Sequence, residues 1–184
     1  MTDKFFTRLL LLIMFTSLSI WFGGSLVRSA LGYELFHNGN KLEIKTEYSN
    51  EMQLHTVKLF SYGAAYTGTA YIVGFLCVIM FLIKWRGNLK QIGWLFMSIV
   101  IFLLASPIEL YLTYLDFELN RLVLFGQFTN FNDPNIQNLF TSRFTKMSLL
   151  SPITSLSFVT ALFFIIWKPL KLDTSSKEKV DEIS

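Results

Sequence analysis

One acid and one base at the ends of apolar stretches are the first candidates for chemistry in this sequence. Glu109 follows the apolar run from Ile92 to Ala105, and Arg28 follows the run that begins at Leu9. At about 1.5 Å per helical residue, Glu109 lies about 26 Å from Ile92 and Arg28 about 28 Å from Leu9. Charged side chains in membrane segments mark ligand, ion or proton sites by default. We therefore expect Arg28 and Glu109 to lie at one depth, within reach of a salt bridge.

Residues beside Glu109 extend this candidate site into a polar crevice. Pro107 lacks a backbone N–H and obstructs a carbonyl one turn earlier, so it predicts a helix kink just below the acid. Ser106 precedes that proline, and Tyr66 is a further candidate partner for Glu109. We favour the simpler interpretation that Arg28 and Glu109 only mark the membrane interface, where long polar side chains reach water or headgroups, and keep the crevice as the alternative.

Small residues in the second apolar block predict close helix packing. Ala64 with Gly68, and Ala70 with Gly74, are spaced four apart, and Gly24 lies in the first block. Small side chains let helix backbones approach closely within a membrane. We favour packing over the alternative, a substrate path lined by the hydroxyl groups of the fourth block.

The sequence offers no pattern for a metal, a cofactor or a catalytic centre. His37 and His55 could bind a metal with Met52 or with neighbouring glutamates, but their spacing is not diagnostic. We therefore expect no metal and no cofactor. The phosphate loop, the nucleophile elbow and HExxH are absent. Cys77, the only cysteine, has no partner for an internal disulfide. An enzyme is accordingly the third choice among the functions.

Composition indicates that a membrane positions these residues. Of the 184 residues, 52% are hydrophobic and only 16% are charged, whereas soluble domains average about 25% charged. The apolar residues form long blocks, which is typical of membrane spans. The net charge of +3 is small, and the basic residues flank the blocks, so a nucleic-acid partner is not expected.

Four blocks are long enough to cross a hydrocarbon core of about 30 Å. They cover residues 9–27, 59–83, 92–114 and 147–167 and leave outer loops at 28–58 and 115–146. We expect one transmembrane domain over residues 1–172 and a disordered cytoplasmic tail over 173–184. Basic residues crowd the short KWRGNLK link and flank both termini, so the positive-inside rule places all three in the cytoplasm. The predicted location is the plasma membrane, or the inner membrane of a bacterium.

The first block has a second interpretation. A basic start, an apolar run and small residues also resemble a cleaved signal peptide. Arg28 lies where a small residue is required before Ala30, and bulky Trp21 and Phe22 end the apolar run. We therefore expect the first block to remain as a membrane span.

The outer loops are expected to form a small extracytoplasmic cap. Asn38-Gly39 predicts a β-hairpin over about residues 33–45. Asn50 and Pro134 mark helix starts outside the membrane, and the helix from Pro134 is expected to run into the fourth span. The segment 119–131 is apolar but interrupted, which is typical of an interfacial or re-entrant piece.

These patterns predict an all-α membrane protein, a four-transmembrane-helix bundle with that cap. The expected function is an accessory or scaffolding subunit that acts through a protein partner or homo-oligomer. The alternative is a small-solute or lipid transporter or binding protein that uses the crevice at Arg28 and Glu109.

Overall fold

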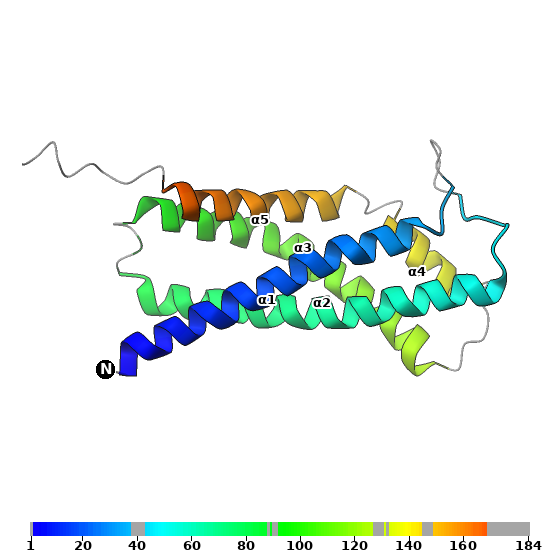
Figure 1. The fold of residues 1–184 in the computed structure, drawn as a ribbon, viewed down its shortest axis with the longest axis horizontal. Helices are drawn as coiled ribbons and strands as arrows, with labels where there is room; N and C mark the ends of the chain where they lie inside the picture. Colours follow the sequence, from blue (N-terminus) through cyan, green and yellow to red (C-terminus); the bar gives the residue numbers. More distant parts are fainter. Residues whose placement is uncertain are drawn as a thin grey trace, which may run out of the picture.

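The computed structural model of the chain is all-helical in the residues that it describes, 2–37, 43–87, 89, 92–126, 131, 133–144 and 149–168. Its helices are α1 (Thr2–Tyr33), α2 (Asn50–Trp85), α3 (Gly93–Phe125), α4 (Pro134–Phe144) and α5 (Leu150–Trp167) (Figure 1). All but α4 are long and apolar enough to span a membrane.

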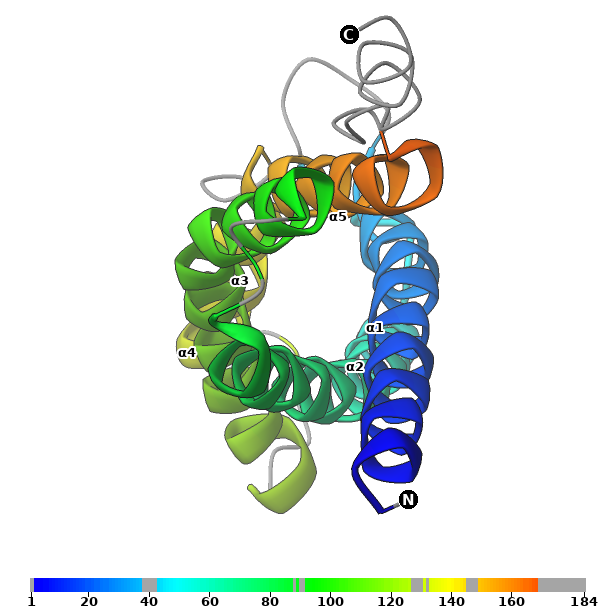
Figure 2. The ribbon, with the colours of Figure 1, turned by 90° about the vertical axis from the view of Figure 1, so that its left-hand side faces the viewer.

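The four long helices form an up-and-down bundle. The start of α1, the end of α2, the start of α3 and the end of α5 lie at one end, which we call the linker end (Figure 1). The opposite end, with α4, residues 34–37 and residues 43–49, is the cap end. Viewed from the linker end, α1 lies beside α2 and α3 lies beside α5 (Figure 2). The α1–α2 and α3–α5 pairs have the most extensive packing.

Two predicted helix starts are confirmed, and local capping accounts for both. The Ser49 hydroxyl accepts a hydrogen bond from the Met52 amide at 3.3 Å, and α2 begins at Asn50. Asp133 Oδ1 accepts a bond from the Asn135 amide at 2.9 Å, and α4 begins at Pro134. Both side chains satisfy amides that have no partner within the helix.

The expected β-hairpin is not supported. The described residues contain no strand there, only a single antiparallel bridge between Phe36 and Ile44. The reason is that α1 continues to Tyr33, and the Phe36 amide then bonds back to the Tyr33 carbonyl at 3.0 Å. Too few residues remain on this side to pair with the returning chain. The predicted turn at Asn38-Gly39 lies outside the described residues.

Two further expectations about the outer loops were wrong. Residues 119–125 are not a separate interfacial piece, because α3 continues without a break to Phe125 and ends at Gly126. The fourth span and the helix from Pro134 are distinct, since α4 ends at Phe144 and α5 begins at Leu150. Figure 1 shows α4 at a different angle from α5. The apolar side of α4 packs onto the cap, which explains why it leaves the direction of α5.

The interior consists of two apolar clusters with buried polar residues between them. The cluster toward the linker end contains Met14, Leu18, Phe81 and Phe102, and the cluster toward the cap end contains Phe36, Phe60, Phe140 and Phe144. Stacked and edge-on ring contacts, such as Phe36 on Phe140 at 5.9 Å between centroids, hold the cap cluster together. The buried polar side chains of the described residues are Ser25, Arg28, Gln53, Ser61, Thr67, Ser98, Ser106, Glu109, Asp116, Asn120, Arg143 and Thr154.

Candidate functional site

Glu109 is the centre of a buried hydrogen-bonded group that joins three helices. The Trp21 indole N–H of α1 donates to Glu109 Oε1 at 2.6 Å, and the Thr154 hydroxyl of α5 donates to Glu109 Oε2 at 2.9 Å. The Glu109 side chain comes from α3 and is only 4% exposed. Both carboxylate oxygens therefore have a donor. We call Trp21, Glu109 and Thr154 the Glu109 cluster.

Asp116 is the centre of a second buried group nearer the cap end. Arg28 Nη1 of α1 lies 2.5 Å from Asp116 Oδ2, and Arg143 Nε of α4 lies 3.1 Å from Asp116 Oδ1. All three side chains are at most 8% exposed. The Arg28 guanidinium also lies over the Phe60 ring, 5.3 Å from its centroid. We call Arg28, Asp116 and Arg143 the Asp116 cluster.

The two clusters follow one register between α1 and α3. Trp21 contacts Glu109, and Arg28 contacts Asp116, so each contact joins residues that are 88 positions apart. Two positions seven residues apart face the same side of a helix and are separated by about 10 Å along it. The parallel helices α1 and α3 therefore form one polar contact every two turns, first Trp21 with Glu109 and then Arg28 with Asp116. On α3, Leu112 lies between the two acids and is fully buried.

The clusters differ in formal charge. Two arginines surround the single carboxylate of Asp116, which leaves an excess of one positive charge. Within the described residues no Lys, Arg or His forms an ion pair with Glu109. With both acids ionised, the buried set therefore sums to zero charge. The positive and negative halves lie on successive levels of the bundle.

The structure does not bring Arg28 and Glu109 together as expected. Each has its own partners, and the two residues lie on different levels. Ser106 is buried, and its hydroxyl donates to the Phe102 carbonyl at 2.8 Å. Pro107 lies inside α3, which continues through it, and the kink stays a prediction. Tyr66 is 76% exposed and has no contact with the acid.

Sequence reasoning missed four residues of the clusters: Trp21, Asp116, Arg143 and Thr154. Asp116 carried a usable signal, because it lies seven residues beyond Glu109 and faces the same side of a continuous helix. Because the predicted third span ended at residue 114, Asp116 was assigned to the following loop and was not recognised as a residue of the same helix. Arg143 and Thr154 carried no such signal, because their roles depend on how α4 and α5 pack on α3.

The small residues of α1 and α2 lie where helices touch. A Cβ on Gly24 would collide with Thr67 Cγ2 of α2, and a Cβ on Gly74 would lie 2.7 Å from Leu18 Cδ2 of α1. At Gly68 the nearest neighbour is Thr113 Cγ2 of α3, at 3.2 Å. Ala64 is 2% exposed and belongs to the cap cluster.

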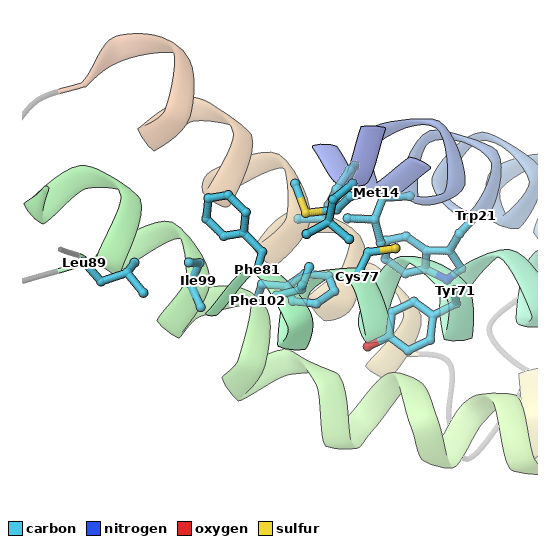
Figure 3. Packing of buried hydrophobic residues seen from close by; sticks show 12 residues of the cluster. Met14, Trp21, Tyr71, Cys77, Phe81, Leu89, Ile99 and Phe102 are labelled. Carbon is cyan, nitrogen blue, oxygen red and sulfur yellow. The ribbon is translucent and has the colours of Figure 1, made fainter. Parts of the chain in front are cut away.

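A cavity of ≈ 240 Å³ lies between the helices toward the linker end. All four spanning helices line it, with side chains that include Met14, Val78, Phe102 and Phe158. Figure 3 shows Met14, Phe81 and Phe102 among the packed side chains of this region. Its one hydroxyl, on Ser98, is already bonded to the Trp94 carbonyl at 2.9 Å. The cavity therefore offers almost no polar group to water. We call it the main cavity.

A small cavity of ≈ 10 Å³ lies beside Glu109. Its walls are the Glu109 cluster together with Tyr71, Phe102, Ala105 and Phe158. Phe102 and Phe158 line the main cavity as well, so the two spaces share these walls. Phe102 and Phe158 thus border both spaces, and Glu109 lines the smaller one.

Other hollows and the histidines offer weaker sites. A groove of ≈ 260 Å³ between α1 and α2 is lined by Tyr66 and by Arg28, but its lining is otherwise mostly apolar. A groove of ≈ 270 Å³ at the cap has uncharged polar walls, including Thr46 and Gln137. Among the described residues no three His, Cys, Asp or Glu side chains gather as metal ligands would.

Comparison of the chain with protein-family models, with curated proteins and with solved structures gives no match.

Proposed function

We propose that this membrane protein binds a small apolar molecule, or one chain of a lipid, inside its helix bundle. The main cavity carries the proposal. Protein interiors are close-packed, and voids of this size are few. The main cavity of ≈ 240 Å³ is partly open at the surface of the bundle, and its apolar walls would bury the surface of an apolar guest.

The chemistry of the walls favours an apolar guest over water. A dry cavity of about 150 Å³ lined by aliphatic and aromatic side chains is enough to hold benzene or xenon. Water needs two to four polar partners, which these walls do not supply. The lining of the main cavity thus favours ligand binding, at a place nearer the linker end than the expected site at Arg28.

The gap between α1 and α5 provides the entry route in this proposal. These helices pack less closely on each other than α1 on α2 or α3 on α5. Phe158 of α5 contacts Trp21 and Phe22 of α1 at 5.5 and 5.3 Å between ring centroids. Toward the linker end from these rings, Leu11 and Ile165 line the cavity from the two helices. A guest dissolved in the bilayer would enter sideways past these side chains.

Photolabelling tests the proposal. Wild-type protein in lipid nanodiscs is irradiated with a diazirine-bearing alkanol, and the adducts are mapped by mass spectrometry. We expect adducts on the walls of the main cavity, and we expect Ala161→Leu to remove them because the larger side chain fills the space. Ala65→Leu, on the exposed side of α2, is the matched control and keeps them. Adducts confined to outward-facing residues such as Leu104 would contradict the proposal.

A second candidate function is the accessory or scaffolding role, and the outer part of α3 favours it. The 33 residues of α3 extend about 50 Å, well beyond a hydrocarbon core of about 30 Å. Near its end Phe117 is 62% and Phe125 is 85% exposed, which suits a protein partner or a second copy. Gentle purification from native membranes should then retain a stoichiometric partner that Phe117→Ser with Phe125→Ser removes and Leu104→Ser does not. A monomer without a partner contradicts this role.

A further inference from the structure

We propose that the ligand is a lipophilic primary amine, with its chain in the main cavity and its ammonium group on Glu109. The inference rests on the proposed function and names the chemical class of its ligand. It comes from the juxtaposition of an apolar chamber, a carboxylate with no counter-ion among the described residues, and a wall of aromatic rings.

The carboxylate supplies the charge. Glu109 is buried, and in the described part of the chain no cation pairs with it. Its two neutral donors, Trp21 and Thr154, occupy one lone pair on each oxygen. A carboxylate has about four lone-pair sites, so it can accept further bonds. A buried charge without a partner is costly, and an ammonium ligand would remove that cost.

Aromatic rings surround the position beside the carboxylate. The Trp21 ring lies 5.1 Å from Tyr71 and 5.5 Å from Phe158, centroid to centroid, and Tyr71 lies 6.2 Å from Phe102. All four rings line the small cavity. Aromatic faces attract cations, most strongly where water is excluded. The rings and the acid therefore favour a cationic head and give an anionic head nothing to bind.

The size of the small cavity selects the kind of cation. A space of ≈ 10 Å³ accommodates a group of about the size of one water molecule. A primary ammonium group fits this limit and donates hydrogen bonds, whereas a quaternary ammonium is bulkier and donates none. The chain of the amine would pass the shared walls, Phe102 and Phe158, into the main cavity.

The Asp116 cluster does not reverse this preference. Its excess positive charge lies about 10 Å from Glu109 along α3, with Leu112 between them. An ammonium in contact with Glu109 is several times closer to the negative charge than to the positive one. The attraction therefore dominates, because Coulomb energies fall with distance.

A charge series tests the inference on the wild-type protein. Octylamine, octan-1-ol and octanoate compete with the photoreactive alkanol for the main cavity in nanodiscs of zwitterionic lipid, at a pH where the amine is charged. We expect octylamine to compete at least about tenfold more strongly than octanol, a difference of about 1.4 kcal/mol, and octanoate to compete least. Octylamine no stronger than octanol, or octanoate strongest, would overturn the inference.

A substitution then assigns the preference to its residue. Glu109→Gln should remove the advantage of octylamine and leave competition by octanol unchanged, while Glu118→Gln, the same change at a less buried acid of α3, keeps the advantage. An advantage that survives Glu109→Gln overturns the assignment. Because the wild-type series needs no variant, the inference stays testable if Glu109→Gln fails to fold. If the photoreactive alkanol itself does not label the cavity, the proposed function fails instead.

Discussion

Glu109 and Asp116 occupy equivalent positions on one side of α3, yet their surroundings are opposite. In the part of the chain that the structure describes, Asp116 pairs with two arginines, and the donors to Glu109 are neutral. A carboxylate held between two guanidinium groups suits a structural role, because removing it leaves two buried charges unpaired. A carboxylate with neutral donors beside a cavity suits a ligand. Asp116 is therefore the acid that stabilises the fold, and Glu109 is the candidate acid for binding a ligand.

Removing the Asp116 charge should destabilise the bundle strongly. Asp116→Asn leaves Arg28 and Arg143 buried without their counter-ion, a change that typically costs about 3–5 kcal/mol. Thermal unfolding in detergent or nanodiscs measures the loss. The double variant Asp116→Asn with Arg28→Gln restores the formal charge of the buried set to zero. It should therefore lose less than the sum of the two single variants. Additive losses would show that the three side chains are not coupled.

The exposed contacts of Glu34 at the cap predict a measurable pKa. The Tyr48 hydroxyl donates to Glu34 Oε1 at 2.8 Å, and with the Lys45 ammonium it holds the pKa of Glu34 below its ordinary value. Any stabilisation from these contacts is present above the ordinary pKa of 4.5 and is lost as the pH falls through the lowered value. Tyr48→Phe should raise the NMR titration midpoint of Glu34, and Tyr33→Phe should not. An unchanged midpoint in Tyr48→Phe would contradict the contact.

At the scale of helices, the register between α1 and α3 explains why polar side chains lie inside an apolar bundle. α1 and α3 run in parallel, and the seven-residue interval carries both polar contacts between them. α4 and α5 each complete one contact, through Arg143 and Thr154. The clusters thus join helices that are far apart in the sequence, and they fix how far each helix slides along its neighbours.

Close contact between α1 and α2 should make one glycine sensitive and its neighbour tolerant. A Cβ on Gly24 collides with Thr67, whose branched side chain has little freedom, whereas a Cβ on Gly23 meets nothing within 4 Å. We expect Gly24→Ala to cost about 1–3 kcal/mol. Gly23→Ala is the matched control and should not lower the unfolding midpoint. Equal midpoints for the two variants would mean that α1 and α2 are not packed this closely.

The helices were predictable from the sequence, and their ends and partners were only partly so. Uninterrupted apolar runs require helices in a membrane, because every backbone group must be bonded internally. The starts at Asn50 and Pro134 followed from capping residues. The end of α3 was missed because the expected third span stopped at residue 114. The helix continues to Phe125, with Asp116 and Asn120 on its buried side and Arg121 exposed. The contact between Arg28 and Asp116 depends on the register of α1 against α3. The position of a residue along its own helix does not define that register.

At the scale of the whole molecule, the start of α1 and the end of α5 both lie at the linker end (Figure 1). Basic residues gather there, and Lys84 lies over Phe6 and Lys168 over Trp94, each within 5.5 Å of the ring centroid. In our proposal this end faces the cytoplasm, because positive residues concentrate on that side. α1 provides a partner to each buried cluster, so its retention as a span is part of the same proposal.

Cysteine labelling tests this orientation. In a Cys77→Ala background, Glu51→Cys places a thiol at the start of α2, near the cap end, and Gly87→Cys places one at the linker end. A membrane-impermeant thiol reagent added to intact cells should label Glu51→Cys but not Gly87→Cys. Both variants should react after permeabilisation. Labelling of Gly87→Cys alone in intact cells would reverse the proposed topology.

The most direct test of the account is to locate a guest in the main cavity. A crystal structure with a bromine-tailed alkanol, read by the anomalous signal of bromine, would do so. We predict a bromine peak between the four spanning helices, beside Met14 and Phe102, in the wild type and in Ala65→Leu but not in Ala161→Leu. Peaks restricted to the outer surface of the bundle, with side chains closing the cavity, would contradict the central claim that the bundle holds an apolar ligand.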